Sequence, residues 1–297
     1  AASNDEIKWA LAKAEMPALL PCLAFLTGDK SLLRDGLRPN LLRLREPFNG
    51  YSEDQQNEIR MLALGAIVRL RDEPGREHSD ISDVWMHRLM EHVVGEHVPA
   101  GYIDMLKEEL SITNEDWRKP SWRASEVSPQ RDFRVAIIGA GMSGILAAHR
   151  LRQVGIDIIV YEKNTDVGGT WLENQYPGCR VDNPNHMYSY SFKQRHDWPF
   201  FFSPQPVLLE YFRRCSDEFG VRDAIRFSTR VESLSFDYHD QMWSVTTVGP
   251  SGRELTRVNA VISAVGQLNR PILPPIPGSD TFRGPSFHSA QWRHDVD

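Results

Sequence analysis

Three glycines near the middle of the chain carry the clearest chemical signal. They stand in the pattern Gly-x-Gly-x-x-Gly, after a short apolar run rich in β-branched residues and before an amphipathic stretch. Gly139 permits a tight turn, Gly141 lets the backbone approach a pyrophosphate, and Gly144 lets the helix lie close to the sheet. The helix start then offers free N–H groups and the positive end of its dipole to phosphates. This chemistry is dinucleotide binding.

A carboxylate stands where a dinucleotide site needs one. The second expected strand, residues 157–161, ends directly before Glu162, which is twenty-three positions beyond Gly139. Glu162 would accept hydrogen bonds from a ribose, and it would repel the extra 2′-phosphate of NADP. The glycine loop is therefore predicted to hold FAD or NAD, with Lys163 as a further cofactor contact.

The residues after Glu162 favour FAD over NAD. The strand–helix alternation of a nicotinamide-binding unit stops, and a loop-rich stretch follows over residues 164–202. The segment 263–266 would end a returning strand next to the glycine loop. A βαβ unit interrupted by an antiparallel meander is typical of large FAD-binding domains. The expected elements are a helix over 205–219 and strands over 225–236, 242–248 and 255–265.

Composition excludes several classes of function. The chain has 297 residues, enough for two domains, with 41% hydrophobic and 25% charged residues, as in soluble globular proteins. Its net charge of −6 lies in residues 1–130, and residues 131–297 are neutral. This argues against a nucleic-acid or membrane partner. No apolar run is long enough to span a bilayer, and no signal segment opens the chain. Three widely separated cysteines indicate reduced thiols and a cytoplasmic protein.

The fold predicted from these patterns has three parts. Residues 1–115 form an all-helical domain, 116–130 a linker, and 131–297 an incomplete FAD-binding domain. The last is of the α/β class, Rossmann-like, with a βαβ unit plus an antiparallel meander. In the helical domain, a helix starting at Asp80 is expected to have an apolar face made of Val84, Trp85, Leu89, Met90 and Val93. That face predicts homodimerisation, with a domain that has no partner as the alternative.

The histidines of the helical domain are tempting as metal ligands. His87 and His92 stand near helical spacing, and His78 and His97 flank them. We interpret all four as solvated helix histidines, and we predict no metal site.

Two further stretches carry a resemblance to a known family. Gly168-Gly169-Thr170-Trp171 leads to 176–182 (Tyr-Pro-Gly-Cys-Arg-Val-Asp) and 188–192 (Tyr-Ser-Tyr-Ser-Phe). Near the end, residues 282–292 match the pattern Phe-x-Gly-x-x-x-His-x-x-x-Trp, the fingerprint of flavin-dependent Baeyer–Villiger monooxygenases. The chain resembles this family, and it is most similar to the N-terminal part of the 4-hydroxyacetophenone monooxygenases. One departure is Arg293, where the family commonly has Pro or Asp. The fingerprint residues are Phe282, Gly284, His288 and Trp292.

The resemblance implies an FAD- and NADPH-dependent enzyme. It would insert one oxygen of O₂ next to the carbonyl of a small-molecule ketone, expected to be an aryl ketone, and give an ester. Gly169, Thr170 and Trp171 would contact the pyrophosphate, ribityl chain and flavin edge. Asp182 would be the catalytic residue and a cofactor contact. Further implied contacts are Tyr188, to phosphate or ribityl oxygens, and Val231, to adenine through its backbone, while His288 and Trp292 would link domains.

Structural alternatives stay open for several of these residues. The two glycines before Trp171 also suit a turn above a core tryptophan, Asp182 suits an Asx-turn before Pro184, and Tyr188 suits a core tyrosine.

The resemblance also predicts what this chain does not contain. The family continues into an NADPH-binding domain with its own glycine motif, and its arginine beside the flavin would lie beyond Asp297. The 297 residues contain one such motif. We therefore expect the N-terminal part of a longer enzyme, inactive by itself. The alternatives are an N- or S-oxidising flavin monooxygenase, or a non-catalytic FAD-binding or dimerising module.

Overall fold

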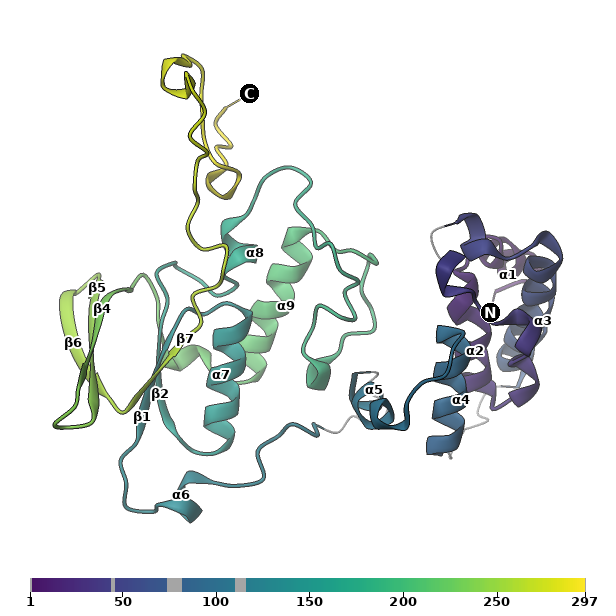
Figure 1. Cartoon of the computed structure of the whole chain (residues 1–297), viewed down its shortest axis with the longest axis horizontal. Helices are drawn as coiled ribbons and strands as arrows, with labels where there is room; N and C mark the ends of the chain where they lie inside the picture. The colour runs from purple at the N-terminus through teal and green to yellow at the C-terminus, as the bar shows by residue number, and fades with distance from the viewer. Residues whose placement is uncertain (1, 44–45, 74–81, 110–115, 297) are drawn as a thin grey trace. The chain divides into compact units, whose positions relative to one another are not determined.

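The structure, a computed structural model, describes residues 2–43, 46–73, 82–109 and 116–296 (Figure 1). The chain divides into two compact units, residues 1–110 and residues 111–297. The helix start expected at Asp80 and the histidine at position 78 lie outside the described residues. Among the described residues, no helix combines the length and the apolar character that crossing a membrane requires.

The described elements of the first unit are helical, and their ends follow local sequence signals. Helix α3 begins with a capping box, in which the Gln55 N–H donates to Ser52 Oγ (3.2 Å) and the Ser52 N–H to Gln55 Oε1 (3.0 Å). Helix α2 ends at Gly28, whose φ of 66° suits a left-handed cap. The helices are α1 (Asn4–Leu11), α2 (Met16–Thr27), α3 (Glu53–Asp72), α4 (Asp83–Val94) and α5 (Ile103–Glu109), with 3₁₀ turns η1 (Lys30–Leu32), η2 (Asp35–Leu37), η3 (Leu41–Arg43), η4 (Pro47–Gly50) and η5 (Ala100–Tyr102).

The core of this unit corrects the predicted face of α4. Trp85, Leu89 and Met90 are buried, as expected, but Val84 is 81% exposed and Val93 is 39% exposed. Val84 lies beside the buried stripe, and Val93 lies in the last turn of the helix. Because Trp85 and Leu89 pack into the core of their own unit, they are not available to a partner.

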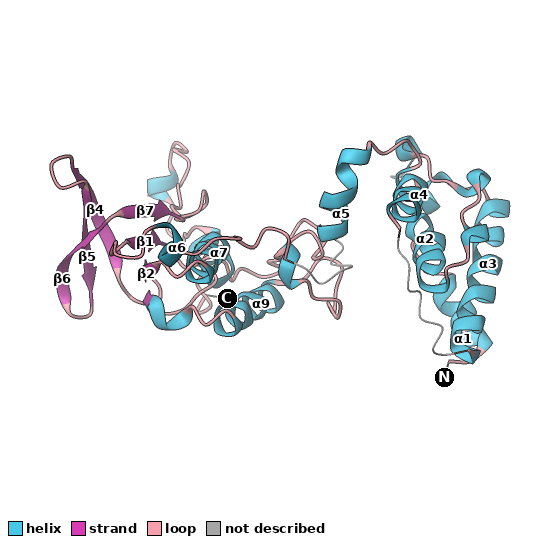
Figure 2. Ribbon diagram, turned by 90° about the horizontal axis from the view of Figure 1, so that it is seen from below, coloured by secondary structure: helices cyan, strands magenta, loops and turns pink. Residues whose placement is uncertain are grey.

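The second unit contains two sheets (Figure 2). One is parallel, with strand order β3-β2-β1-β7, and the other is the antiparallel meander β4-β5-β6. The predicted α/β class is confirmed. The strands are β1 (Arg134–Ile138), β2 (Asp157–Tyr161), β3 (Ile225–Arg226), β4 (Arg230–Asp237), β5 (Met242–Gly249), β6 (Gly252–Val258) and β7 (Ala260–Ser263). The helices are α6 (Ala124–Val127), α7 (Met142–Gln153), α8 (Thr170–Glu173) and α9 (Gln205–Glu218), with 3₁₀ turns η6 (Ser191–Lys193), η7 (Arg222–Ala224), η8 (Ser279–Thr281) and η9 (Ser289–Gln291).

Two of the three predicted strands each cover two strands of the structure. The stretch 225–236 breaks at Ser228, whose φ of 52° no extended strand allows, so that β3 joins the parallel sheet and β4 starts the meander. The stretch 255–265 breaks at Asn259, between β6 in the meander and β7 in the parallel sheet. Both breaks mark the point where the chain passes from one sheet to the other.

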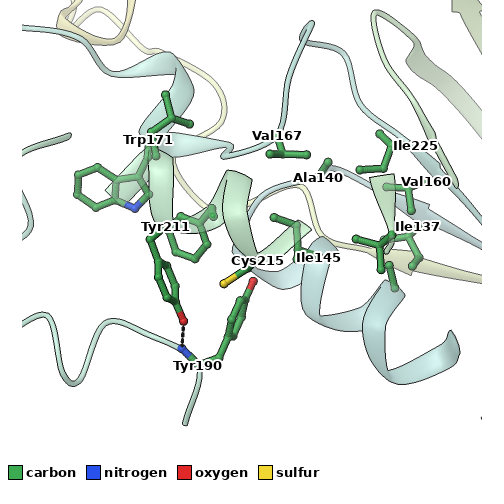
Figure 3. Packing of buried hydrophobic residues seen from close by; sticks show 14 of the residues in the cluster. Ile137, Ala140, Ile145, Val160, Val167, Trp171, Tyr190, Tyr211, Cys215 and Ile225 are labelled. Atoms are coloured by element: carbon green, nitrogen blue, oxygen red, sulfur yellow. Dashed lines mark hydrogen bonds between the residues drawn. The ribbon is translucent and has the colours of Figure 1, made fainter. Parts of the chain in front are cut away.

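The alternation of side chains along β1 places one layer on each face of the parallel sheet. Val135 and Ile137 pack with Ile145 of α7 and Phe212 of α9, the side shown in Figure 3. Ala136, which points the other way, packs with residues of the meander and of β2. These meander and β2 residues are Val245, Val258 and Tyr161. The parallel sheet is therefore covered by helices on one face and by the meander on the other.

The segment before β1 is fixed to α7 by an ion pair. Asp116 binds Arg150 through two hydrogen bonds, one of 2.8 Å, and both side chains are less than one-fifth exposed. Burial raises the pKa of Asp116, but the hydrogen bond and charge of Arg150 outweigh it and hold that pKa below its ordinary value. Trp117 and Trp122 of this segment are 57% and 46% exposed.

Candidate functional site

Two of the three glycines in the loop between β1 and α7 have no room for a side chain. Gly139 has a φ of 102°, and a Cβ there would lie 2.6 Å from the carbonyl oxygen of Ala264. A Cβ on Gly144 would lie 1.9 Å from the carbonyl oxygen of Gly139. The N–H of Ala264 donates to Ile138 O at 2.9 Å, so the end of β7 reaches the loop, as the sequence predicts. The spacing of the glycines is thus fixed by backbone packing.

The loop opens into a cavity of about 790 Å³. Its wall is formed by chain segments that follow parallel strands, the usual place for a ligand in an open α/β sheet. Gly144 lies behind the wall, where it serves helix packing. The predicted residues that line the cavity are Gly139, Gly141, Glu162, Lys163, Gly169, Thr170, Trp171, Tyr188 and Val231.

Glu162 is oriented by the backbone on both sides. Its side chain is 4% exposed, with Oε2 accepting the N–H of Ala140 (2.7 Å) and Oε1 the N–H of Asn164 (2.9 Å). Each carboxylate oxygen has a further lone pair. Glu162 can therefore hold the glycine loop and still accept a hydroxyl from the cavity.

Lys163 lies on the rim of the cavity. Its Nζ is 2.9 Å from Glu173 Oε1, and it also donates to Asn269 Oδ1. This second contact holds the segment after β7 beside the loop after β2.

A second glycine pair forms the opposite wall. Gly168 and Gly169 have φ values of 120° and 53°, and the Gly168 N–H donates to Ala140 O at 3.1 Å. A Cβ on Gly169 would lie 3.0 Å from the Cα of Gly141, so the two glycine segments face each other closely. At the end of this wall, Trp171 Nε1 donates to the hydroxyl of Tyr188 at 3.1 Å, with the rings edge to face.

Asp166 supports the second glycine pair from behind. It accepts hydrogen bonds from Arg222 Nη2 (2.6 Å), Arg213 Nε (2.7 Å) and the Val167 N–H (2.8 Å). Burial raises the pKa of Asp166, but these three hydrogen bonds outweigh it and hold the pKa below its ordinary value. The carboxylate therefore keeps its charge at neutral pH and ties α9 and η7 to the loop.

The loop between α8 and α9 is held by a fully buried asparagine. Asn185 Nδ2 donates to Phe200 O and to Ser203 Oγ, both at 2.6 Å, and its Oδ1 accepts the Ser203 N–H at 3.0 Å. Asn185 and Ser203 are both 0% exposed. The Tyr188 N–H donates to Asn185 O at 3.0 Å, so this clasp also positions Tyr188 in the cavity wall.

Asp182, the predicted catalytic residue, is exposed and is not among the residues that line the cavity. It lies in a bend three residues before Asn185. Its catalytic role stays a prediction.

The fingerprint residues also lie outside the cavity lining, in the exposed segment after β7. His288 Nδ1 accepts the Ala290 N–H at 3.0 Å and so caps the turn η9. That turn brings Trp292 edge to face against Phe287, with ring centroids 5.2 Å apart. Phe282 is 64% exposed and Gly284 is exposed as well. Within this segment the fingerprint histidine thus shapes the backbone.

Some lining residues were missed from the sequence. They follow β3 or β7, so correct strand ends would have placed them, because ligands bind beyond the carboxyl ends of parallel strands. These residues are Thr229, Arg230, Glu232 and the segment 267–270.

Comparison with known proteins agrees with this geometry. A family model described as NAD(P)-binding Rossmann-like domain matches residues 137–212. An uncharacterized monooxygenase of Sinorhizobium fredii is 36% identical over 299 residues, covering 99% of this chain and 44% of that protein. A Baeyer–Villiger monooxygenase of Streptomyces coelicolor is 45% identical over 165 residues, covering 55% of this chain and 31% of that protein. The chain is homologous to Baeyer–Villiger monooxygenases.

Two solved structures have the same fold over about half of this chain. The crystal structure of OTEMO in complex with FAD and NADP (form 3) matches with a TM-score of 0.51 and 37% identity, over 55% of this chain and 31% of that one. Cyclohexanone monooxygenase with bound ε-caprolactone matches with a TM-score of 0.51 and 36% identity, over 55% and 32%. The chain thus spans less than half the length of these relatives. They do not test the narrower likeness to 4-hydroxyacetophenone monooxygenases, which stays a prediction.

Proposed function

We propose that these residues form the FAD-binding part of a Baeyer–Villiger monooxygenase. Such an enzyme uses NADPH and O₂ to insert one oxygen next to the carbonyl of a ketone. The cavity at the glycine loop carries the proposal, because it combines a helix start, a buried carboxylate and two facing glycine segments. An adenine dinucleotide fits this arrangement, because the glycine backbone at the start of α7 carries no side chain that would keep the pyrophosphate away. Bound FAD would supply the redox chemistry, taking a hydride from NADPH and activating O₂.

The residues of the chain would then bind and orient the cofactor. The first N–H groups of α7 have no partner within the helix and would hold the pyrophosphate. Glu162 would accept ribose hydroxyls, and the backbone of Val231 would meet the adenine. Trp171 and Tyr188, held together by their hydrogen bond, would border the flavin end.

The proposed role of Asp182 rests on the resemblance in sequence, and Asp182 stands two residues before Pro184, whose carbonyl oxygen accepts the Tyr188 N–H at 3.2 Å. Asp182 would orient a cationic partner near the flavin.

We propose an aryl ketone as the substrate class, on the resemblance in sequence. The names of the relatives favour ketone oxidation over N- or S-oxidation, and they favour an enzyme over a non-catalytic module.

The test is NADPH oxidation with product analysis. The protein is incubated with FAD, NADPH and an aryl ketone, and separately with a thioether. Ester from the ketone is the expected product of the complete enzyme, and sulfoxide alone would contradict the proposal. The 297 residues contain one glycine motif and hence one dinucleotide site. Tested by themselves, they should bind FAD weakly and form no ester, and ester from this chain would show that the catalytic residues were misplaced.

We also propose that the first unit mediates homodimerisation. Trp85 and Leu89 are buried and cannot contact a second copy. Other apolar side chains of the same unit are between 66% and 81% exposed, namely Trp9, Met61 and Val84. Light scattering over a dilution series should give the mass of a dimer. A monomer mass at all concentrations would reject the proposal.

A further inference from the structure

A cluster of two histidines and a glutamate lies on the C-terminal half of α4 and the segment that follows it. His87 and Glu91 are one helical turn apart and so share a face of the helix. Gly95 ends the helix with a φ of 77°, and a Cβ there would lie 2.1 Å from Pro39 O. This tight turn sends the chain back, so that His97 reaches the side chain of Glu91.

The three side chains converge on one oxygen. Glu91 Oε1 is 3.4 Å from His87 Nε2 and 2.6 Å from His97 Nδ1. One ligand atom from each residue lies within 4.8 Å of the other two. Glu91 and His87 are about one-quarter exposed or less, whereas the His97 side chain is 76% exposed. The cluster is thus anchored on the helix side and open to solvent on the other.

The backbone after the helix completes the anchoring. The Val98 N–H donates to Glu91 Oε1 at 3.3 Å, and Val98 O accepts a hydrogen bond from His87 Nε2, so this nitrogen must exchange its proton for the metal when a metal binds. Val98 itself is 7% exposed. The returning segment is therefore packed, and the carboxylate between the two imidazoles is held by a backbone donor.

We propose that His87, Glu91 and His97 bind a divalent transition-metal ion, with Zn²⁺ as the best fit. Two imidazoles and one carboxylate with a water in the fourth position is a zinc donor set. Ligand atoms of a tetrahedral zinc lie about 3.3 Å apart, given Zn–N distances of about 2.0–2.1 Å. The separation of His87 from Glu91 already matches. The 2.6 Å distance between His97 Nδ1 and Glu91 Oε1 must increase when a metal replaces the proton between these atoms. The exposed His97 ring has room for this movement.

The donor set also selects among metals. Imidazole nitrogen suits Zn²⁺, Ni²⁺ and Cu²⁺, whereas Mg²⁺ prefers oxygen ligands. His92, which sequence reasoning paired with His87, is 1% exposed, and burial lowers its pKa to about 4. It belongs to the core, and the residue that completes the cluster is Glu91.

The experiment is metal titration of the full chain by calorimetry. Metal-free protein is titrated with Zn²⁺ at neutral pH, with Mg²⁺ as a separate arm and Co²⁺ as a spectroscopic probe of tetrahedral binding. All variants carry Cys22→Ser, because this exposed thiol would itself bind zinc. One equivalent of Zn²⁺ should bind, and visible Co²⁺ bands should appear and vanish on adding Zn²⁺.

The variants His97→Ala and Glu91→Gln should each weaken zinc binding at least about tenfold. His239→Ala is the matched control, since His239 is exposed and also pairs with a carboxylate, that of Asp240. If Glu91→Gln changes the circular dichroism spectrum, the zinc affinity of His97→Ala tests the proposal instead, because replacing an exposed side chain should leave the fold intact. The proposal would be overturned if the protein took up no zinc or bound Mg²⁺ more tightly than Zn²⁺. It would also be overturned if His239→Ala weakened zinc binding as much as the variants of the cluster do.

Discussion

Replacing Gly141 by valine in the complete enzyme is expected to abolish FAD binding and to leave the second unit folded. A Cβ at this position meets the Cα and the nitrogen of Gly169, at 3.5 and 3.9 Å, and both are ordinary contacts. The rest of the valine side chain would fill the gap between the two glycine segments, where the pyrophosphate is proposed to lie. Affinity for FAD should fall at least about a hundredfold, or about 2.7 kcal/mol.

The measurement is quenching of flavin fluorescence during titration with protein. Gly36→Val is the matched control, because a Cβ at Gly36 meets nothing within 4 Å and the residue lies in the other unit. Circular dichroism should show the same helix content in both variants. Unchanged FAD affinity in Gly141→Val would place the pyrophosphate elsewhere.

Replacing Asn185 by alanine should produce the largest loss of stability among the polar residues of the second unit. The change leaves buried polar groups of Phe200 and Ser203 without their partner. Each such group costs about 1–3 kcal/mol, so we expect a loss of about 3 kcal/mol. For a unit of this size, the midpoint of thermal unfolding should fall by roughly 6–12 °C.

Thermal unfolding followed by circular dichroism measures this effect. His186→Ala is the control, because His186 is an exposed neighbour of Asn185. Its carbonyl oxygen accepts hydrogen bonds from Ser189 and Gln194, and the substitution keeps both. A shift in Asn185→Ala no larger than that of the control would mean that water replaces the lost partners.

The glycine loop could be predicted from sequence because its constraints are local. Gly144 packs against the carbonyl oxygen of Gly139, five positions earlier, and Glu162 is placed by the next strand. Strand ends could not be predicted in the same way. The residues around Ser228 and Asn259 continue an apolar pattern, and only tertiary pairing decides that the chain changes sheets there.

The His87 cluster was missed for a related reason. Sequence reasoning compared histidines along one helix, whereas the third ligand returns to the helix through the turn at Gly95. Asp182 shows the opposite case, because its likeness to a family motif predicts a role that its exposed position does not yet reveal.

The strand order of the parallel sheet has a consequence for how the molecule folds. The N–H of Arg134, the first residue of β1, donates to Oδ1 of Asn259, the residue before β7, and 125 positions separate the two residues. Strand β1 can therefore pair with β7 only after the long segment between them has been synthesised. Loop-closure entropy must be overcome before that pairing gives any stability, which makes such topologies slow to form. Until β7 arrives, one edge of β1 offers open hydrogen-bonding groups, so this edge is where the nascent chain is most exposed to misassociation.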